Sequence, residues 1–125
     1  MLTKTGNNSS AGFTLVEIMI VVGILGLLLG IMVPYYVNQR ATAQANGCIN
    51  NLFKLQAASD QFAVENGKST GDSINYPTDL KPYIKLTQSG QIPPCPGGGT
   101  YAIAQVGGRP VCSLGTLVKP PHILP

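Results

Sequence analysis

The chain has 125 residues, enough for one domain, and only 10% of them are charged, whereas charged residues make up about 25% of a typical soluble domain. Its eight basic and five acidic residues give a net charge of +3 and form no basic cluster, which argues against direct binding of nucleic acid. The three cysteines show no CxxC or Cys/His spacing, so we expect an oxidising compartment and neither a metal ion nor another cofactor.

The N-terminal part of the chain divides into a polar leader and an apolar segment. Residues 1–12 are rich in Gly, Ser and Asn, carry Lys4 as their only charge, and are too short to fold alone. Residues 13–37 are almost wholly apolar, with Glu17 as their only charge. As a helix, with a rise of about 1.5 Å per residue, this segment would be about 37 Å long and would exceed the roughly 30 Å hydrocarbon core of a bilayer. We therefore predict one membrane-spanning helix at 13–37.

Residues 38–66 are predicted to continue this helix in amphipathic form. Apolar residues recur at intervals of three and four, which places them on one face of the helix. They are Ala45, Ile49, Leu52, Leu55, Ala58 and Phe62. Gly67 follows the segment and can adopt the left-handed conformation that ends a helix. An unbroken helix from Phe13 to Asn66 would be about 80 Å long, so its first half must be buried by a membrane or by other subunits.

Residues 67–125 are predicted to form a small, loop-rich head. We expect a short helix at 78–84, and strands at 100–106 and 109–114 that two glycines join in a tight hairpin. The fold class is therefore α+β, with a long N-terminal helix and an antiparallel sheet of two or three strands packed on its outer half.

The cysteines predict one disulfide in the head. The hairpin places Cys112 opposite Ile103 and leaves Cys95 free to fold back towards Cys112 from the glycine-rich bend at 97–99. A Cys95–Cys112 disulfide would close a loop of about 18 residues and contribute on the order of 3 kcal/mol. Cys48, on the helix, is expected to be a small buried thiol, although the sequence leaves its pairing with either other cysteine open.

Glu17 is open to two interpretations. Residues 14–17, TLVE, fit the capping box that starts a helix, with Phe13 and Ile18 placed as the hydrophobic staple. This does not explain an acid in a membrane segment, where an unpaired charge near the centre costs about 2.5–3.5 kcal/mol. Cleavage between Gly12 and Phe13 would create a positive α-amino group one helical turn from Glu17. The same amine on a neighbouring copy would be a partner for the carboxylate.

Residues 12–17, GFTLVE, followed by the long apolar run, resemble the cleavage and methylation motif of the type IV prepilin family, which includes the pseudopilins of type II secretion systems. The resemblance implies that a membrane-embedded prepilin peptidase cuts after Gly12 and methylates the new amine of Phe13. It also implies that Glu17 registers subunits in a helical filament by neutralising a neighbour's terminus, and that an inner-membrane platform assembles this filament.

Small residues line one face of the membrane segment. Gly23, Gly26, Gly30 and Pro34 are spaced three or four apart, and Gly26 and Gly30 form a GxxxG motif for close helix packing. Pro34 removes the hydrogen bond to the carbonyl of Gly30 and weakens the helix there. Filaments similar to this family often lose regular helix at such a pair, so the resemblance implies melting around 30–34.

The resemblance leaves two kinds of filament. We expect a pseudopilin of a type II secretion system, with the alternative of a type IV pilin in a surface pilus for adhesion, motility or DNA uptake. Major pseudopilins commonly bind calcium in their C-terminal loops, yet no Asp or Glu follows Asp79. A C-terminal region closed by cysteines is more reminiscent of type IV pilins.

Location and partners follow from the same motif. Lys4 in the leader favours a single-pass inner-membrane protein with a cytoplasmic N-terminus and a periplasmic head. The mature chain would then join a periplasmic or extracellular filament. Expected partners are further copies, the prepilin peptidase, the assembly platform and membrane lipid.

Two other classes of function are alternatives. A membrane-tethered periplasmic binding module would use the long helix as a stalk. A small exported enzyme would need convergent Ser, His, Cys or carboxylate groups, but the head has one His and two acids, and that His122 is expected to lie in a solvated tail. We therefore expect a structural protein and not an enzyme.

Overall fold

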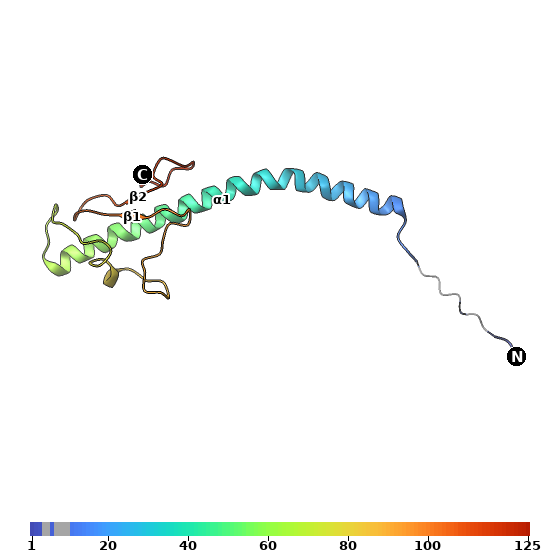
Figure 1. The fold of residues 1–125 in the computed structure, drawn as a ribbon, viewed down its shortest axis with the longest axis horizontal. Helices are drawn as coiled ribbons and strands as arrows, with labels where there is room; N and C mark the ends of the chain where they lie inside the picture. The colour runs from blue at the N-terminus through green and yellow to red at the C-terminus, as the bar shows by residue number, and fades with distance from the viewer. Residues whose placement is uncertain (4–5, 7–10) are drawn as a thin grey trace. The chain divides into compact units, whose positions relative to one another are not determined.

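The computed structural model describes residues 1–3, 6 and 11–125. The elements in chain order are helix α1 (Leu15–Asn66), the short 3-10 helix η1 (Lys81–Tyr83), and the strands β1 (Tyr101–Ala102) and β2 (Val111–Cys112) (Figure 1). The chain divides into two compact units, Met1–Tyr36 and Val37–Pro125. This confirms the α+β class, in which a long N-terminal helix is combined with a small antiparallel sheet.

The first unit consists mainly of the N-terminal half of α1. The helix begins at Leu15, two residues later than predicted, and runs without a break through Pro34. By length and composition it is apolar enough to cross a membrane, and none of its most apolar stretch is buried by the part of the chain that the structure describes. Every side chain from Leu15 to Tyr36 is exposed. The unit therefore leaves an apolar helix surface with no cover from the rest of the described chain.

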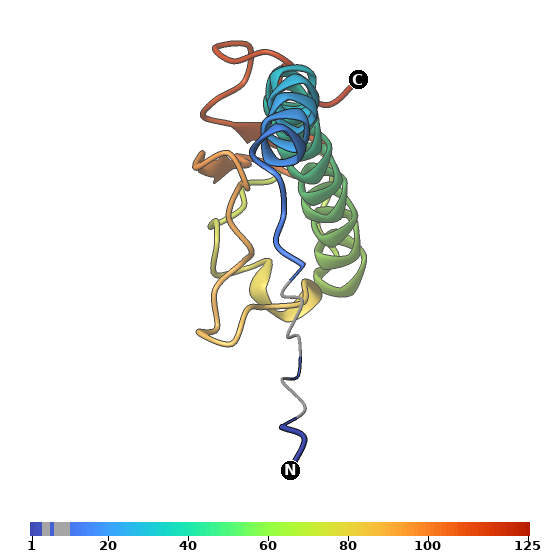
Figure 2. The same cartoon turned by 90° about the vertical axis from the view of Figure 1, so that its right-hand side faces the viewer.

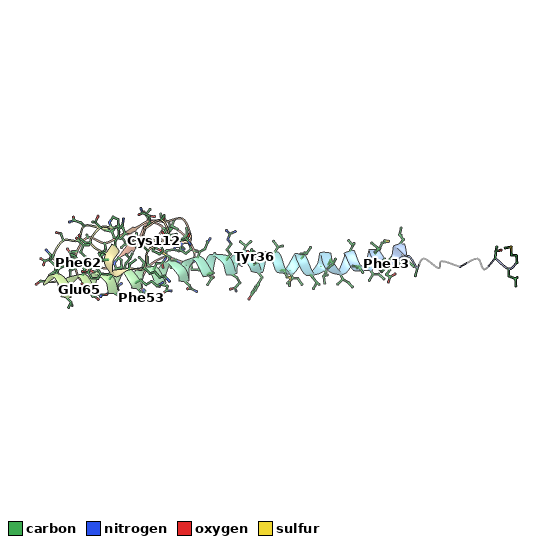
Figure 3. All side chains as sticks on the ribbon, turned by 90° about the horizontal axis from the view of Figure 1, so that it is seen from below. Phe13, Tyr36, Phe53, Phe62, Glu65 and Cys112 are labelled. Carbon is green, nitrogen blue, oxygen red and sulfur yellow. The ribbon has the colours of Figure 1, made fainter. Side chains whose placement is uncertain are left out.

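The second unit is built on one face of the C-terminal half of α1. The buried side chains of this half recur at helical spacing, as the periodicity predicts. They are Ala45, Cys48, Leu52, Leu55, Ala58, Ser59, Phe62 and Ala63. The loops and strands of the head lie along one side of this half of the helix (Figure 2). Phe53, on the other side, is 50% exposed (Figure 3).

The C-terminal end of α1 is closed as the sequence predicts. Gly67 has a φ of 62°, and the backbone N–H of Lys68 donates to the carbonyl of Ala63 at 2.8 Å. This is a Schellman cap, which satisfies a carbonyl that the last helical turn leaves free. The helix predicted at 78–84 shortens to the three residues of η1.

The register of β1 and β2 differs from the predicted hairpin. Tyr101 pairs with Cys112, and Ala102 pairs with Val111. The expectation that Cys112 lies opposite Ile103 was therefore wrong by two positions. Because the side chains of a strand alternate between faces with a period of two, this shift keeps Cys112 on the predicted face.

The segment that follows α1 explains the shift. Ser73 forms an antiparallel bridge with Gln105, and the backbone N–H of Val106 donates to the carbonyl of Asp72 at 2.8 Å. The second half of the predicted first strand thus pairs with a segment that the sequence predicted to be a connector. Pro110 directly precedes β2 and has no N–H group, so it cannot extend the pairing of β1 and β2 by donating a hydrogen bond.

Candidate functional site

The N-terminal motif lies directly before α1 and is accessible. Residues 11–14 have no regular secondary structure, and Gly12, Phe13 and Glu17 are all exposed. Figure 3 shows Phe13 at the start of the helix. The peptide bond between Gly12 and Phe13 therefore lies outside the helix, in a backbone segment that a protease can bind without unwinding α1.

Thr14 and Glu17 form both hydrogen bonds of a capping box. The backbone N–H of Glu17 donates to Oγ1 of Thr14 at 3.2 Å, and the backbone N–H of Thr14 donates to Oε2 of Glu17 at 3.4 Å. The negative carboxylate also lies where the helix dipole favours it. In the single chain Glu17 therefore acts as a helix cap, and its role in assembly stays a prediction.

The glycines of the first unit lie in open space among the residues that the structure describes. A Cβ atom built on Gly23, Gly26 or Gly30 would meet nothing within 4 Å. Whatever packing these glycines serve must therefore involve another molecule. α1 is regular through Pro34, so melting around 30–34 stays a prediction for the assembled state.

A second cluster lies inside the head and was not expected. Cys48 comes from α1, Cys95 from the loop before β1, Cys112 from β2, and His122 from the C-terminal segment. Their sulfur and ring nitrogen atoms all lie within 4.8 Å of one another, and all four residues are buried. The three thiols are free. The sequence had predicted only that Cys95 and Cys112 would lie close together.

His122 is not part of a solvated tail, so that expectation was wrong. Its side chain is 3% exposed, and Nδ1 lies 3.2 Å from the Sγ atom of Cys95. The C-terminal segment turns back on itself, since the backbone N–H of His122 donates to the carbonyl of Gly115 at 2.7 Å. This hydrogen bond folds the C-terminal segment so that the imidazole of His122 lies in the cluster.

Glycines allow the loop before β1 to approach the cluster. The N–H of Gly98 donates to the carbonyl of Cys95 at 2.9 Å, which closes a turn with Pro96 in its second position. A Cβ atom on Gly97 would lie 2.8 Å from Cε1 of His122, and one on Gly99 would lie 2.7 Å from Sγ of Cys112. Only residues without a side chain fit at these two positions.

A third glycine, Gly47, belongs to α1 and faces the same loop. A Cβ atom on Gly47 would lie 3.0 Å from Cγ of Pro96, so the helix surface beside Cys48 is flat enough for the loop to pack on it. The hydroxyl of Tyr101 accepts a hydrogen bond from Nδ2 of Asn51 at 3.1 Å. Tyr101 also hydrogen-bonds to the Cys48 sulfur.

The thiols of the cluster have different acidities. Burial raises the pKa of Cys48 to about 12, and the neighbouring thiols of Cys112 and Cys95 act in the same direction. Burial also acts to raise the pKa of Cys95, but hydrogen bonds from the backbone N–H groups of Gly99 and Gly97 and from His122 lower it to about 7. Cys95 therefore ionises more readily than Cys48.

The predicted Cys95–Cys112 disulfide stays a prediction. The two sulfurs are close, as such a bond requires, but Cys48 and His122 are equally part of the cluster. The sequence missed the complete set because its members lie far apart in the chain and share no fixed ligand spacing. The signal that could have found it is that the head, which packs on the helix face carrying Cys48, contains both other cysteines and the single histidine of the chain.

Comparisons with known proteins match the N-terminal motif to a protein family model. Residues 7–33 match the family model described as the prokaryotic N-terminal methylation motif. No solved structure matches the chain significantly.

Among curated proteins, the chain is similar to type II secretion system core protein G of Klebsiella michiganensis. The two are 26% identical over 108 residues, which cover 79% of this chain and 76% of that protein. A fimbrial protein of Pseudomonas aeruginosa is 36% identical over 78 residues, covering 62% of this chain and 49% of that protein. Core protein G of Escherichia coli is 29% identical over 83 residues, covering 66% and 52%. The chain thus spans about half the length of the last two relatives.

Proposed function

We propose that the chain is a structural subunit of a pilus-like filament, because residues 7–33 match the prokaryotic N-terminal methylation motif. We further propose that this filament is the pseudopilus of a type II secretion system. The similarity to a core protein of such a system extends over more than three quarters of both chains. This is broader than the match to the fimbrial protein.

The observation that carries the proposal is the uncovered apolar surface of the first unit. Every side chain from Leu15 to Tyr36 is exposed within the described chain, although most of them are large and apolar. A surface of this kind is unstable in water and needs an apolar environment. Lipid supplies it for the precursor, and the same helices of neighbouring copies supply it in a filament. The bare backbone at Gly26 and Gly30 suits close helix packing.

We infer that prepilin peptidase cuts after Gly12 and methylates the amine of Phe13. The exposed backbone before α1 supports this assignment, because cleavage there leaves the capping box intact. The new amine carries a full positive charge. A charge-assisted hydrogen bond from that amine of a neighbouring copy would be stronger than the 3.4 Å bond that Oε2 of Glu17 accepts in the single chain. The ion pair would thus favour assembled over isolated subunits.

The position of Lys4 before the apolar helix supports the topology that we propose. The leader with Lys4 lies in the cytoplasm, α1 crosses the inner membrane once, and the head lies in the periplasm. The peptidase and the assembly platform are membrane partners in this scheme. The chemistry of processing belongs to the peptidase, and the chain itself contributes binding surfaces.

The test is expression of the full chain together with a prepilin peptidase and the assembly proteins of a type II secretion system. We expect a mature protein that begins with N-methylated Phe13, and filaments visible by electron microscopy. A control without the peptidase should retain residues 1–12 and give no filaments. A processed chain that stays monomeric under these conditions would contradict the proposal and would favour a membrane-tethered module.

The type IV pilin is the second candidate, supported by the 36% identity to a fimbrial protein. The two candidates differ in where the filament lies. Long fibres sheared from the cell surface would identify a pilus. Co-purification with a secretion complex, with no sheared fibres, would identify a pseudopilus.

A further inference from the structure

Four buried side chains, one from α1 and three from the head, match the ligands of a structural zinc site in number and type. Three thiols and one imidazole have their ligand atoms within 4.8 Å of one another, and the four residues are between 0% and 6% exposed. Zinc in structural sites is bound by four such ligands in a tetrahedron, with sulfur and nitrogen as the preferred donors. We propose that Cys48, Cys95, Cys112 and His122 bind one zinc-type divalent metal ion.

The spacing of the ligand atoms fits this assignment. Zn–S bonds of about 2.3 Å and Zn–N bonds of about 2.0 Å in a tetrahedron place the ligand atoms about 3.5–3.8 Å apart. The cluster has 3.2 Å between Sγ of Cys95 and Nδ1 of His122, and no separation beyond 4.8 Å. Changes of up to about 1 Å in these separations would therefore close the site around an ion. Because Nδ1 faces the sulfurs, it is the ring nitrogen that would bind.

Groups around the cluster are arranged to support thiolate ligands. The sulfur of Cys95 accepts hydrogen bonds from the backbone N–H groups of Gly97 and Gly99. Cys48 is hydrogen-bonded to Tyr101, whose hydroxyl oxygen is in turn held by Asn51. Outer partners of this kind orient metal ligands and stabilise their charge. These hydrogen bonds hold two of the three sulfurs in place within the cluster.

The composition of the cluster favours a metal over a disulfide. A disulfide joins two of the three cysteines and leaves a buried thiol and a buried imidazole beside it. A metal ion uses all four side chains, and binding would release three protons as the three thiols become thiolates. Four protein ligands leave no open position for substrate, so the site is structural and not catalytic.

The consequence of binding is mechanical. One ligand comes from α1, and the others come from the loop before β1, from β2 and from the C-terminal segment, so one ion would fasten three separate parts of the head to the helix. A head of this size has a small core, and domains of this kind commonly rely on a metal or disulfides. His122 also lines a cavity of about 200 Å³ together with Gly97 and Leu114. The proposal does not depend on filament assembly.

The test uses the full chain in detergent, isolated from membranes without added metal or reductant. We expect about one zinc per chain by elemental analysis. All three thiols should be unreactive in the native protein and should react after unfolding with a chelator. Replacement of the zinc by Co²⁺ should give the intense visible absorption of a tetrahedral cobalt–thiolate site.

Variants then assign the ligands. His122→Ala and Cys112→Ser are expected to weaken Zn²⁺ binding by more than about tenfold, and Tyr101→Phe by about 10- to 100-fold. Leu117→Ala is the matched control, because Leu117 is in the same C-terminal region but is 83% exposed. It should retain zinc at the wild-type level. If a variant fails to fold, the zinc content and the thiol count of the wild-type chain together decide the question.

Three results would overturn the proposal. A zinc-free wild-type chain with only one reactive thiol after unfolding would show a disulfide instead. A zinc-free chain with three reactive thiols that does not bind added Zn²⁺ would show simple buried cysteines. Equal zinc in the wild type and in both ligand variants would show adventitious binding elsewhere.

Discussion

A Cβ atom on Gly99 would lie 2.7 Å from the Sγ atom of Cys112, closer than side-chain carbons approach such atoms in proteins. The same Cβ would lie 2.9 Å from Cγ of Leu114. Gly99 is therefore the position where the loop before β1 is packed most tightly on β2 and the segment after it. Any side chain here must displace the core of the head.

We expect Gly99→Ala to destabilise the head by about 1–3 kcal/mol, the usual cost of overpacking. The measurement is urea unfolding of the full chain in detergent, followed by the near-ultraviolet circular dichroism of its tyrosines. Leu117→Ala, at a position that is 83% exposed, serves as the control and should change stability by less than about 0.5 kcal/mol. Equal stability of both variants would mean that the loop is not held against Cys112.

The exposed bond before α1 makes a prediction about processing. Gly12→Asp should leave the full-length precursor, because a side chain with a charge would stand at the residue that the peptidase must accept. Intact-mass measurement after co-expression with a prepilin peptidase reports the outcome directly. Gly6→Asp puts the same carboxylate elsewhere in the leader and should be cut normally. Removal of residues 1–12 from the Gly12 variant at the wild-type rate would refute the cleavage assignment.

Glu17 can be tested with a pair of variants that separate its two roles. Glu17→Gln keeps a side chain that suits a capping box but removes the charge, whereas Glu17→Ala removes both. If the ion pair with a neighbour matters, both variants should be processed and inserted but should form few filaments. Filament yield per processed chain, counted by electron microscopy, is the measurement. Wild-type yield from Glu17→Gln together with low yield from Glu17→Ala would reduce Glu17 to a helix cap.

The packed face of α1 gives a prediction about stability. Leu55 is fully buried against the head, and Leu55→Ala should lower the free energy of unfolding by about 2–5 kcal/mol because it removes apolar contact and leaves a cavity. Phe53→Ala, two positions away at a site that is 50% exposed, should cost much less. Urea unfolding under identical detergent conditions compares the two. Similar losses in both variants would mean that the head does not pack on the Leu55 face.

Local patterns predicted the helix well. The spacing of Leu52, Leu55 and Phe62 places them on one face whatever they pack against, and Gly67 ends the helix through its own backbone conformation. The GFTLVE motif was equally readable, since its residues are contiguous. These features depend on neighbours in the sequence, so the sequence alone carries them.

Features that depend on distant contacts were not predicted. The bridge between Gln105 and Ser73 joins residues more than thirty positions apart in the sequence. The predicted hairpin had instead paired the strand that contains Gln105 with residues 109–114. His122 looked solvated because prolines surround it. Its burial follows from the bridge to Gly115 and from the absence of a side chain at Gly97, neither of which a periodicity can reveal.

The exposed apolar surface of the first unit restricts how a subunit can travel. Leu27, Ile31 and Met32 are each more than 60% exposed, and burying one such side chain is worth about 1.5–3 kcal/mol. A mature subunit that left lipid before reaching its neighbours would lose this stabilisation along the whole helix at once. Under the proposed function, a freely diffusing aqueous subunit is therefore not an intermediate. Each helix must exchange lipid contacts for protein contacts gradually, at the point where the filament base meets the bilayer.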